Sequence, residues 1–242
     1  MMGLLEILKN MFITNQCLLC HEPISYENKT GFCDDCKEEW DAFLNVKCVR
    51  CGYKISECAC TPKLIKQSFN YGAISCVFYN PDANLVANNL IFTLKRDFDM
   101  DLIDFFAEMM VKNLHILAKR HGIILDEYTV TYVTRRESGE RKYGFDHTKY
   151  LAKAVSKKLG LKCQKALLNV GDIEQKSLTK QERLENAKNS FEINEKIDVK
   201  GRKYLLVDDI ITSGATMKAC ADVLRENGAE EIIPVSFAKN NG

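Results

Sequence analysis

Two groups of residues in this chain have the types and the spacing that chemistry requires. The first is a set of eight cysteines within the first 60 residues, spaced as three C-x2-C pairs and one C-x-C pair. Its members are Cys17, Cys20, Cys33, Cys36, Cys48, Cys51, Cys58 and Cys60. The second is the run 204–216, YLLVDDIITSGAT, in which two consecutive carboxylates end a hydrophobic segment. The first group suits metal binding, and the second suits binding of a phosphorylated sugar.

The cysteine spacing predicts two structural metal sites. Two thiolates separated by two residues lie on one tight turn, so both sulfur atoms reach a single ion at about 2.3 Å, and a second pair completes a tetrahedron. Eight thiolates therefore make two closed zinc sites, which leave no coordination position for water. The simplest grouping is sequential, with one site from residues 17–36 and the other from 48–60, although interleaved pairing stays open. Iron–sulfur ligation is the chemical alternative, because four cysteines serve both.

The cysteine-rich segment is acidic. Residues 1–62 hold six Lys/Arg and nine Asp/Glu, a balance of −3, and each zinc ion with four thiolates adds about −2. Affinity for nucleic-acid phosphates comes from cations. The balance therefore favours a docking or interface role over DNA binding by this segment alone.

The run 204–216 combines two kinds of binding group. The carboxylates of Asp208 and Asp209 accept hydrogen bonds from a vicinal diol such as the ribose hydroxyls, but they repel phosphate. The loop that follows offers hydroxyls, backbone N–H groups and a helix N-terminus, which suit a phosphomonoester. Its residues are Thr212, Ser213, Gly214, Ala215 and Thr216. A diol site beside a phosphate site predicts ribose 5-phosphate, and neither G-x-x-x-x-G-K-[ST] nor G-x-G-x-x-G occurs in the chain.

The elements that position these groups alternate along the chain. We expect strands at 71–79, 128–134, 204–207 and 231–238, and helices at 100–117, 150–159 and 217–227. This alternation predicts an α/β fold in which helices flank a parallel sheet and a ligand crevice lies at the carboxyl ends of the strands. We divide the chain into a small double zinc-ribbon domain at 1–62, a linker at 63–70 and the α/β domain at 71–242.

Composition and charge limit the remaining possibilities. The 242 residues are 46% hydrophobic and 28% charged, enough for one full α/β domain and a smaller one. The net charge is +1, so a polyanionic partner must use a local patch. Apolar residues near the N-terminus fall at helical spacing, which predicts a short amphipathic helix rather than a signal peptide. Because no apolar run reaches the roughly 18 residues of a membrane span, we expect a cytoplasmic protein with reduced cysteines.

The run 204–216 resembles the hallmark of the type I phosphoribosyltransferases, a hydrophobic strand, two acidic residues and a T/S-T/S-G-x-T loop that binds 5-phosphoribosyl 1-pyrophosphate (PRPP). Other segments narrow the resemblance to the ComF family. Residues 135–147, RRESGERKYGFDH, are similar to its R-G-F-[ND]-Q segment, with Tyr143 replacing arginine and His147 replacing glutamine. Leu94-Lys95 resembles its L-K-F element, and residues 175–191 resemble its Q-x2-L-x4-R-x2-N-x4-F stretch. Because the N-terminus resembles its double zinc ribbon, the similarity covers essentially the whole chain.

The resemblance implies a zinc ribbon fused to a phosphoribosyltransferase-like domain, associated in bacteria with DNA uptake during natural competence. It implies PRPP binding by the acidic pair and the loop 212–216, with magnesium bridging pyrophosphate and ribose oxygens. Arg135, Arg136 and Arg141 follow the strand at 128–134, where this fold has its pyrophosphate loop, so they are candidate ligands of the leaving group. The implied reaction is displacement of pyrophosphate at ribose C1.

A basic stretch raises the question of nucleic-acid partners. Residues 135–165 hold ten Lys/Arg and three Asp/Glu, a local charge of +7. Lysines on the helix expected there could contact single-stranded DNA, although a solvated helix face explains them equally well. These are Lys149, Lys153, Lys157 and Lys158. A DNA-uptake helicase or another competence protein is the protein partner that the resemblance implies.

One departure from the family pattern limits the substrate. Where the 6-oxopurine enzymes have an aspartate that contacts the base, this chain has Thr212, which disfavours hypoxanthine and guanine. The accepting nucleophile stays open among a base, ammonia, water, an amino sugar and DNA. Three functions are therefore considered: a phosphoribosyltransferase, a non-catalytic adaptor that binds single-stranded DNA and a partner protein, and a PRPP or nucleotide sensor.

Overall fold

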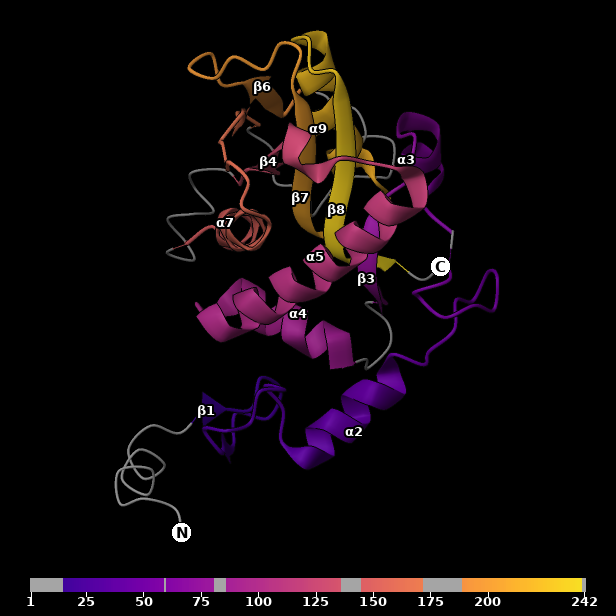
Figure 1. Ribbon diagram of the computed structural model, residues 1–242, viewed down its shortest axis with the longest axis vertical. Helices are drawn as coiled ribbons and strands as arrows, with labels where there is room; N and C mark the ends of the chain where they lie inside the picture. Colours follow the sequence, from indigo (N-terminus) through magenta and orange to yellow (C-terminus); the bar gives the residue numbers. More distant parts are fainter. Residues whose placement is uncertain (1–14, 59, 81–85, 136–144, 172–188, 241–242) are drawn as a thin grey trace.

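The computed structural model describes residues 15–58, 60–80, 86–135, 145–171 and 189–240. A sheet covered by helices forms the larger part of the molecule (Figure 1). The cysteine-rich segment begins beneath α4 in this view and continues along the side of the sheet.

The four-stranded sheet is parallel throughout, as the alternation predicts. Its strands, in spatial order, are β3 (Ile74–Tyr79), β8 (Glu231–Asn240), β7 (Lys203–Ile211) and β4 (Tyr128–Tyr132). The central strands β7 and β8 are almost entirely buried, which explains the apolar runs 204–207 and 232–235 within them. The expected strand at 204–207 is longer than predicted, because β7 continues to Ile211 and includes both Asp208 and Asp209.

Alternate residues of β7 enter two separate hydrophobic cores, because successive side chains of a strand point to opposite faces. Leu205 and Val207 pack in one core, and Tyr204 and Leu206 pack in the other. The first core includes residues of α4 (Val86–Arg96), α5 (Met100–His121) and α7 (His147–Leu159). The second includes residues of α9 (Ala215–Glu226). With both faces covered, polar groups of the sheet can meet solvent only at its ends.

The order in which the chain adds strands to the sheet changes direction between β4 and β7, although the two strands are parallel. Val130 of β4 pairs with Leu205 of β7 on one side, so its parallel bridge to Cys163, after α7, lies on the other side. From β7 the chain runs the opposite way, through α9 to β8. In open α/β sheets such a switch point creates a crevice at the carboxyl ends of the two strands. The fold therefore directs a ligand to the ends of β4 and β7.

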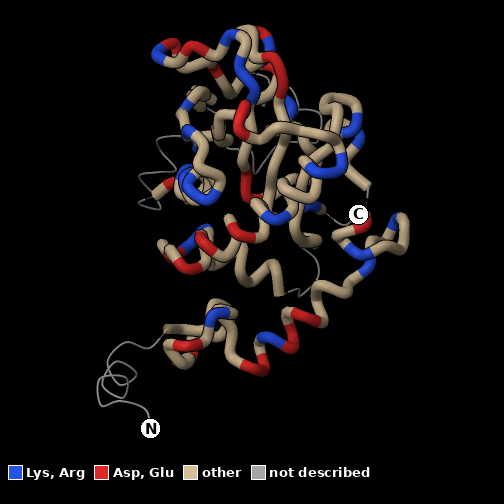
Figure 2. Tube along the Cα trace, in the orientation of Figure 1, with Lys and Arg blue, Asp and Glu red and all other residues tan. Residues whose placement is uncertain are grey.

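Aromatic rings join the N-terminal segment to the helices of the α/β domain. The segment contains β1 (Asn15–Gln16), β2 (Pro23–Ile24) and α2 (Asp34–Phe43), and α2 carries many of its acidic residues (Figure 2). Trp40 of α2 is buried and meets the ring of Phe105 of α5 edge-on, with centroids 5.5 Å apart. Phe32 meets the same ring at 5.3 Å. The segment thus shares one continuous core with α4 and α5.

The expected linker at 63–70 contains a helix, α3 (Lys63–Ser68). Its Ile65 is fully buried against Gly214, where an added Cβ atom would lie 2.6 Å from Ile65 Cγ1. Arg225 of α9 donates a hydrogen bond to the carbonyl of Ser68, which fixes the far end of α3. A helix this short has too few residues to show an apolar period, so tertiary packing rather than local sequence determines it.

The remaining elements are small. They are the antiparallel strands β5 (Leu167–Asn169) and β6 (Phe191–Ile193) and the 3-10 helix η1 (Leu125–Glu127). The expected N-terminal amphipathic helix lies outside the described residues, as do Arg136, Arg141 and most of 175–191. No helix in the described part of the chain is long and apolar enough to cross a membrane.

Candidate ligand site and metal centres

Asp208 and Asp209 lie at the carboxyl end of β7 and face opposite sides of the sheet. Asp209 is buried on the side of α4 and α7, where Lys95 and His147 contact it. Asp208 is partly exposed on the side of α9, near Cys220. A diol that reaches both carboxylates must therefore lie across the end of the strand rather than over one face.

The loop after β7 leads directly into α9. Thr212 and Ser213 are exposed, and Gly214 caps the helix with a positive φ of 81°. Only glycine meets the two demands on this position, because a side chain would be strained by the φ and would collide with Ile65. Ser213 Oγ accepts a hydrogen bond from the N–H of Ala215 at 3.3 Å, and Thr216 follows in the first turn. The positive end of the helix thus lies a few residues from the acidic pair.

Asp209 is the centre of a charged cluster formed by three distant segments. Its Oδ2 atom lies 3.1 Å from Lys95 Nζ of α4 and 2.8 Å from His147 Nε2 of α7. His147 is buried, whereas 36% of the Lys95 side chain is exposed. These residues come from three of the motifs that the sequence shares with known families, namely Leu94-Lys95, 135–147 and 204–216, and the fold brings these three motifs to one carboxylate.

The two aspartates have opposite pKa shifts. Burial raises the pKa of Asp209, but the Lys95 ammonium and the hydrogen bond from His147 outweigh burial and hold that pKa well below its usual range. Burial, and then the negative charge of Asp209, raise the pKa of Asp208 well above its usual range. Asp209 therefore keeps its charge down to low pH, while Asp208 takes up a proton readily.

His147 Nε2 has two neighbours but only one hydrogen-bonding role at a time. Arg135, at the end of β4, places its guanidinium 3.0 Å from Nε2, on the same atom that meets Asp209. A proton on Nε2 is donated to Asp209, whereas a bare Nε2 accepts from Arg135 and leaves the proton on Nδ1. Nδ1 is buried and has no partner among the described residues. Since an unpaired buried donor is costly, we assign the proton to Nε2 and the hydrogen bond to Asp209.

The sequence interpretation and the structure overlap only in part at this site. Arg135 contacts His147, which in turn contacts Asp209 of the acidic pair. Arg136 and Arg141 lie outside the described residues. Lys95 and His147 received no role from the residues alone. Their only signal was their position in motifs shared with the ComF family, because nothing local marks a lysine on an amphipathic helix as the partner of a carboxylate 114 residues away.

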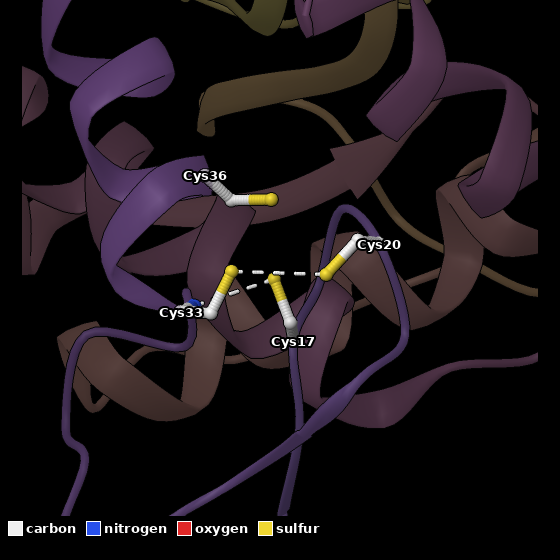
Figure 3. A group of neighbouring side chains, drawn as sticks. All are labelled: Cys17, Cys20, Cys33 and Cys36. Carbon is white, nitrogen blue, oxygen red and sulfur yellow. Dashed lines mark hydrogen bonds between the residues drawn. The ribbon is translucent and has the colours of Figure 1, made fainter.

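The sulfur atoms of Cys17, Cys20, Cys33 and Cys36 converge between the β1–β2 hairpin and the start of α2 (Figure 3). The Sγ atoms of Cys20 and Cys33 lie 3.7 Å apart. Tetrahedral ligands about 2.3 Å from an ion are about 3.8 Å apart, so the cluster has the right size for zinc. Although burial opposes it, backbone N–H groups, including that of Cys33, lower the pKa of Cys17 to about 6. Cys17 is thus the member of the cluster that ionises most easily, whereas the pKa of Cys36 is raised by burial and by the neighbouring cysteines.

The second cluster consists of Cys48, Cys51, Cys58 and Cys60. The Sγ atoms of Cys51 and Cys58 also lie 3.7 Å apart. Burial again opposes ionisation, but backbone N–H groups of Arg50 and Cys51 lower the pKa of Cys48 to about 7. The spatial clusters coincide with the sequential grouping, and each could hold a metal ion such as zinc.

Metal removal should release Trp40, the only tryptophan of the chain, from its buried position. Trp40 is one helical turn from Cys36 on α2, so loss of the first ion frees the end of the helix that holds it. We expect chelation to remove two ions per chain and to shift tryptophan emission to longer wavelength, while the circular dichroism of the larger domain persists.

Single-site variants make this test specific. Cys36→Ser should reproduce the emission shift, and Cys51→Ser should leave it much smaller, because Cys51 belongs to the other cluster. Unchanged emission after both ions have left would show that the aromatic core holds α2 without metal.

The raised pKa of Asp208 should make stability depend on pH. Because its folded-state pKa lies above the unfolded value of about 3.9, folding binds a proton, and this contribution is lost as pH rises from about 4 through the folded-state pKa. Asp208→Asn mimics the protonated form, so its free energy of unfolding should gain on that of the parent as pH rises, by at most about 1.4 kcal/mol per pH unit. Urea unfolding over a pH series measures this, with Asp126→Asn as the matched control. A difference that stays constant with pH would contradict the assignment.

Comparison with known proteins finds a family match for the part of the chain that contains the acidic pair and the loop 212–216. Residues 149–242 match the family model of the phosphoribosyl transferase domain. The DNA utilization protein YhgH of Salmonella typhimurium is 23% identical over 220 residues, covering 89% of this chain and 93% of the relative. YhgH of Escherichia coli O157:H7 is 24% identical over 222 residues with the same coverage. A ribose-phosphate pyrophosphokinase of Pyrococcus abyssi is 52% identical over 40 residues, 16% of this chain and 14% of that protein.

Solved structures give weaker matches. The phosphoribosylpyrophosphate synthetase of Mycobacterium smegmatis is 16% identical with a TM-score of 0.33, covering 55% of this chain and 33% of that one. The glutamine PRPP amidotransferase of B. subtilis is 18% identical with a TM-score of 0.36, covering 64% and 28%. The sequence matches carry the comparison: residues 149–242 match the phosphoribosyl transferase domain, and the chain is similar to the YhgH proteins along most of its length, which supports its resemblance to the ComF family.

Proposed function

We propose that this chain binds PRPP at the carboxyl ends of β4 and β7 and acts as a phosphoribosyltransferase. The observation that carries the proposal is the order of groups along this edge. Arg135 lies three residues beyond the end of β4, the acidic pair lies near the end of β7, and an exposed hydroxyl loop leads from β7 into α9. Pyrophosphate, ribose hydroxyls and 5-phosphate need groups of these three kinds.

Each part of PRPP has its own ligands in this proposal. Asp208 and Asp209 accept hydrogen bonds from the ribose 2′- and 3′-hydroxyls. Thr212, Ser213 and Thr216 supply hydroxyls to the 5-phosphate, together with N–H groups at the start of α9. Arg135, with Arg136 and Arg141, holds the pyrophosphate. A magnesium ion bound with PRPP would neutralise charge on the leaving group.

Lys95 gives the acidic pair a second state. In the structure the Lys95 ammonium is 3.1 Å from Asp209 Oδ2 and neutralises this carboxylate. Lys95 is partly exposed, so an incoming pyrophosphate offers it an anion of higher charge. Transfer of Lys95 to the pyrophosphate releases an Asp209 oxygen for a ribose hydroxyl. A single movement of Lys95 thus serves both the pyrophosphate and the ribose hydroxyls.

In the proposed reaction the bond between ribose C1 and the pyrophosphate oxygen breaks, a bond from C1 to the nucleophile forms, and pyrophosphate leaves with the bonding electrons. Thr212 offers no carboxylate to a purine base, which argues against hypoxanthine and guanine as acceptors. We assign no residue as general base. The acceptor has to be identified by experiment.

The process in which this reaction takes part is proposed from the relatives. The YhgH proteins are named for DNA utilization, and the ComF resemblance points to DNA uptake. We therefore propose a cytoplasmic protein that handles incoming single-stranded DNA together with a helicase or another competence protein.

Calorimetric titration of magnesium PRPP tests the binding site. We expect the parent to bind and Asp208→Ala/Asp209→Ala to lose binding by at least about 100-fold, because two hydrogen-bonding carboxylates are removed, each worth about 1.5–3 kcal/mol. The matched control is Asp126→Ala/Glu127→Ala, a consecutive acidic pair at the amino end of β4. Absence of binding by the parent, or equal loss in the control, would overturn the proposal.

A specific observation favours the adaptor as a second candidate. Basic residues gather on α7 (Figure 2), where Lys153 and Lys157 are exposed and belong to no ion pair in the described part of the chain. Lys158 is different, because its ammonium is 2.9 Å from a carboxylate oxygen of Asp104. The two exposed lysines therefore carry charge that no carboxylate pairs with in the described part of the chain, although Lys153 lies over the ring of Tyr150. Such charge suits contact with a phosphate backbone.

The salt dependence of single-stranded oligonucleotide binding tests the adaptor. If Lys153 and Lys157 each neutralise one phosphate, Lys153→Gln/Lys157→Gln should reduce the slope of log K against log salt by about 1.4. Lys196→Gln/Lys200→Gln, which removes two exposed lysines outside α7, is the control. An unchanged slope would show that α7 is only a solvated face, whereas a changed slope without PRPP binding would favour the adaptor over the transferase.

A further inference from the structure

One lysine of the sheet is buried at the second cysteine cluster. Lys239 lies near the end of β8 and is 4% exposed. Its ammonium donates hydrogen bonds to the carbonyl oxygens of Cys60 at 2.8 Å and Cys58 at 3.1 Å. The Sγ atom of Cys58 lies 3.5 Å from the same nitrogen. A side chain of the α/β domain thus enters the metal-binding loop of the ribbon.

This ammonium has no carboxylate partner within ion-pair distance among the described residues. Its other neighbour is the ring of Phe78, whose centroid is 5.6 Å from Nζ. Two carbonyls and a ring are neutral groups. A buried ammonium with only neutral partners is unfavourable, because it loses its hydration without gaining an opposite charge.

An occupied cysteine cluster supplies the missing charge. Four thiolates and one divalent ion carry a net charge of about −2. The negative charge of the first cluster is compensated in another way. Cys33 lies at the start of α2, and its backbone N–H donates a hydrogen bond to Cys17 Sγ. In the described part of the chain, only the second cluster receives a hydrogen bond from a lysine.

We propose that Lys239 is the charge-compensating partner of the second metal site, and that the pair fastens the ribbon to the end of the sheet. Lys239 pairs in register with Phe78 of β3 and Ile211 of β7, so its backbone is fixed by both neighbouring strands. The metal loop therefore meets a rigidly positioned cation. Loss of the ion would leave that cation buried among neutral groups and would favour release of the loop. The proposal is independent of PRPP binding.

Zinc retention by the full-length protein tests the proposal. Lys239→Met keeps most of the side-chain volume and removes the charge, whereas Lys239→Arg keeps the charge. Lys203→Met is the matched control, because Lys203 is a β7 lysine whose ammonium pairs with Glu127 instead. Titration with a chromogenic chelator follows each ion, and Trp40 emission identifies the ion of the first cluster.

We expect Lys239→Met to weaken zinc binding about 10- to 100-fold at one site only, the site whose ion leaves without a change in Trp40 emission. Lys239→Arg and Lys203→Met should retain both ions as the parent does. Parent-like retention in Lys239→Met would overturn the proposal. Equal weakening at both sites would also overturn it, because it would show general loosening.

Thermal unfolding gives a readout that does not depend on zinc affinity. With zinc bound, Lys239→Met should melt below the parent. After zinc removal it should melt at or above the parent, because it no longer buries an uncompensated charge. An equal loss of Tm in both states would assign Lys239 a packing role and overturn the proposal. If Lys239→Met does not fold with zinc, Lys239→Gln undergoes the same comparison.

Discussion

The strand β7 is buried on both faces, and the rest of the molecule is arranged around that constraint. Its side chains alternate between two cores over residues 204–207. Asp208 and Asp209 continue this alternation, since Asp208 lies on the side of α9 and Asp209 on the side of α4 and α7. Asp209 consequently packs against α4 and α7, where Lys95 and His147 pair with its carboxylate. Asp208, on the other face, forms no ion pair in the described structure, and burial and the charge of Asp209 raise its pKa. One acidic pair thus contains two chemically different carboxyl groups.

Much of the fold could be predicted because its signals are local. The apolar period of α5 and the β-branched run of β4 each lie within one element, and the cysteine pairs are close in sequence. The sequence predicts that this strand ends at Val207, because aspartates are poor strand residues and suggest a loop, whereas β7 continues to Ile211. Had the strand been continued to Ile211, its period of two would have separated Asp208 from Asp209.

The residues that escaped prediction act across long distances in the chain. Lys239 is 181 residues from Cys58, and α3 is a helix only because Ile65 and Ser68 meet α9. No local pattern records such contacts. The acidic balance of residues 1–62 was similarly incomplete as a guide to partners, because the charge of the second cluster is met by a lysine from outside that segment. The net charge of a sequence segment therefore does not give the charge that surrounds it in the folded protein.

The contact between Ile65 and Gly214 joins the loop 212–216 mechanically to the segment that contains the cysteine clusters. Ile65 fills the space behind the first turn of α9, five residues after Cys60. The chain between them is too short to absorb an inserted or deleted residue without turning Ile65 away from Gly214. Proteolytic cleavage within 63–70 would therefore do more than separate two domains, since it would leave the turn that begins α9 without its backing. The ribbon can be exchanged between proteins of this kind only together with α3.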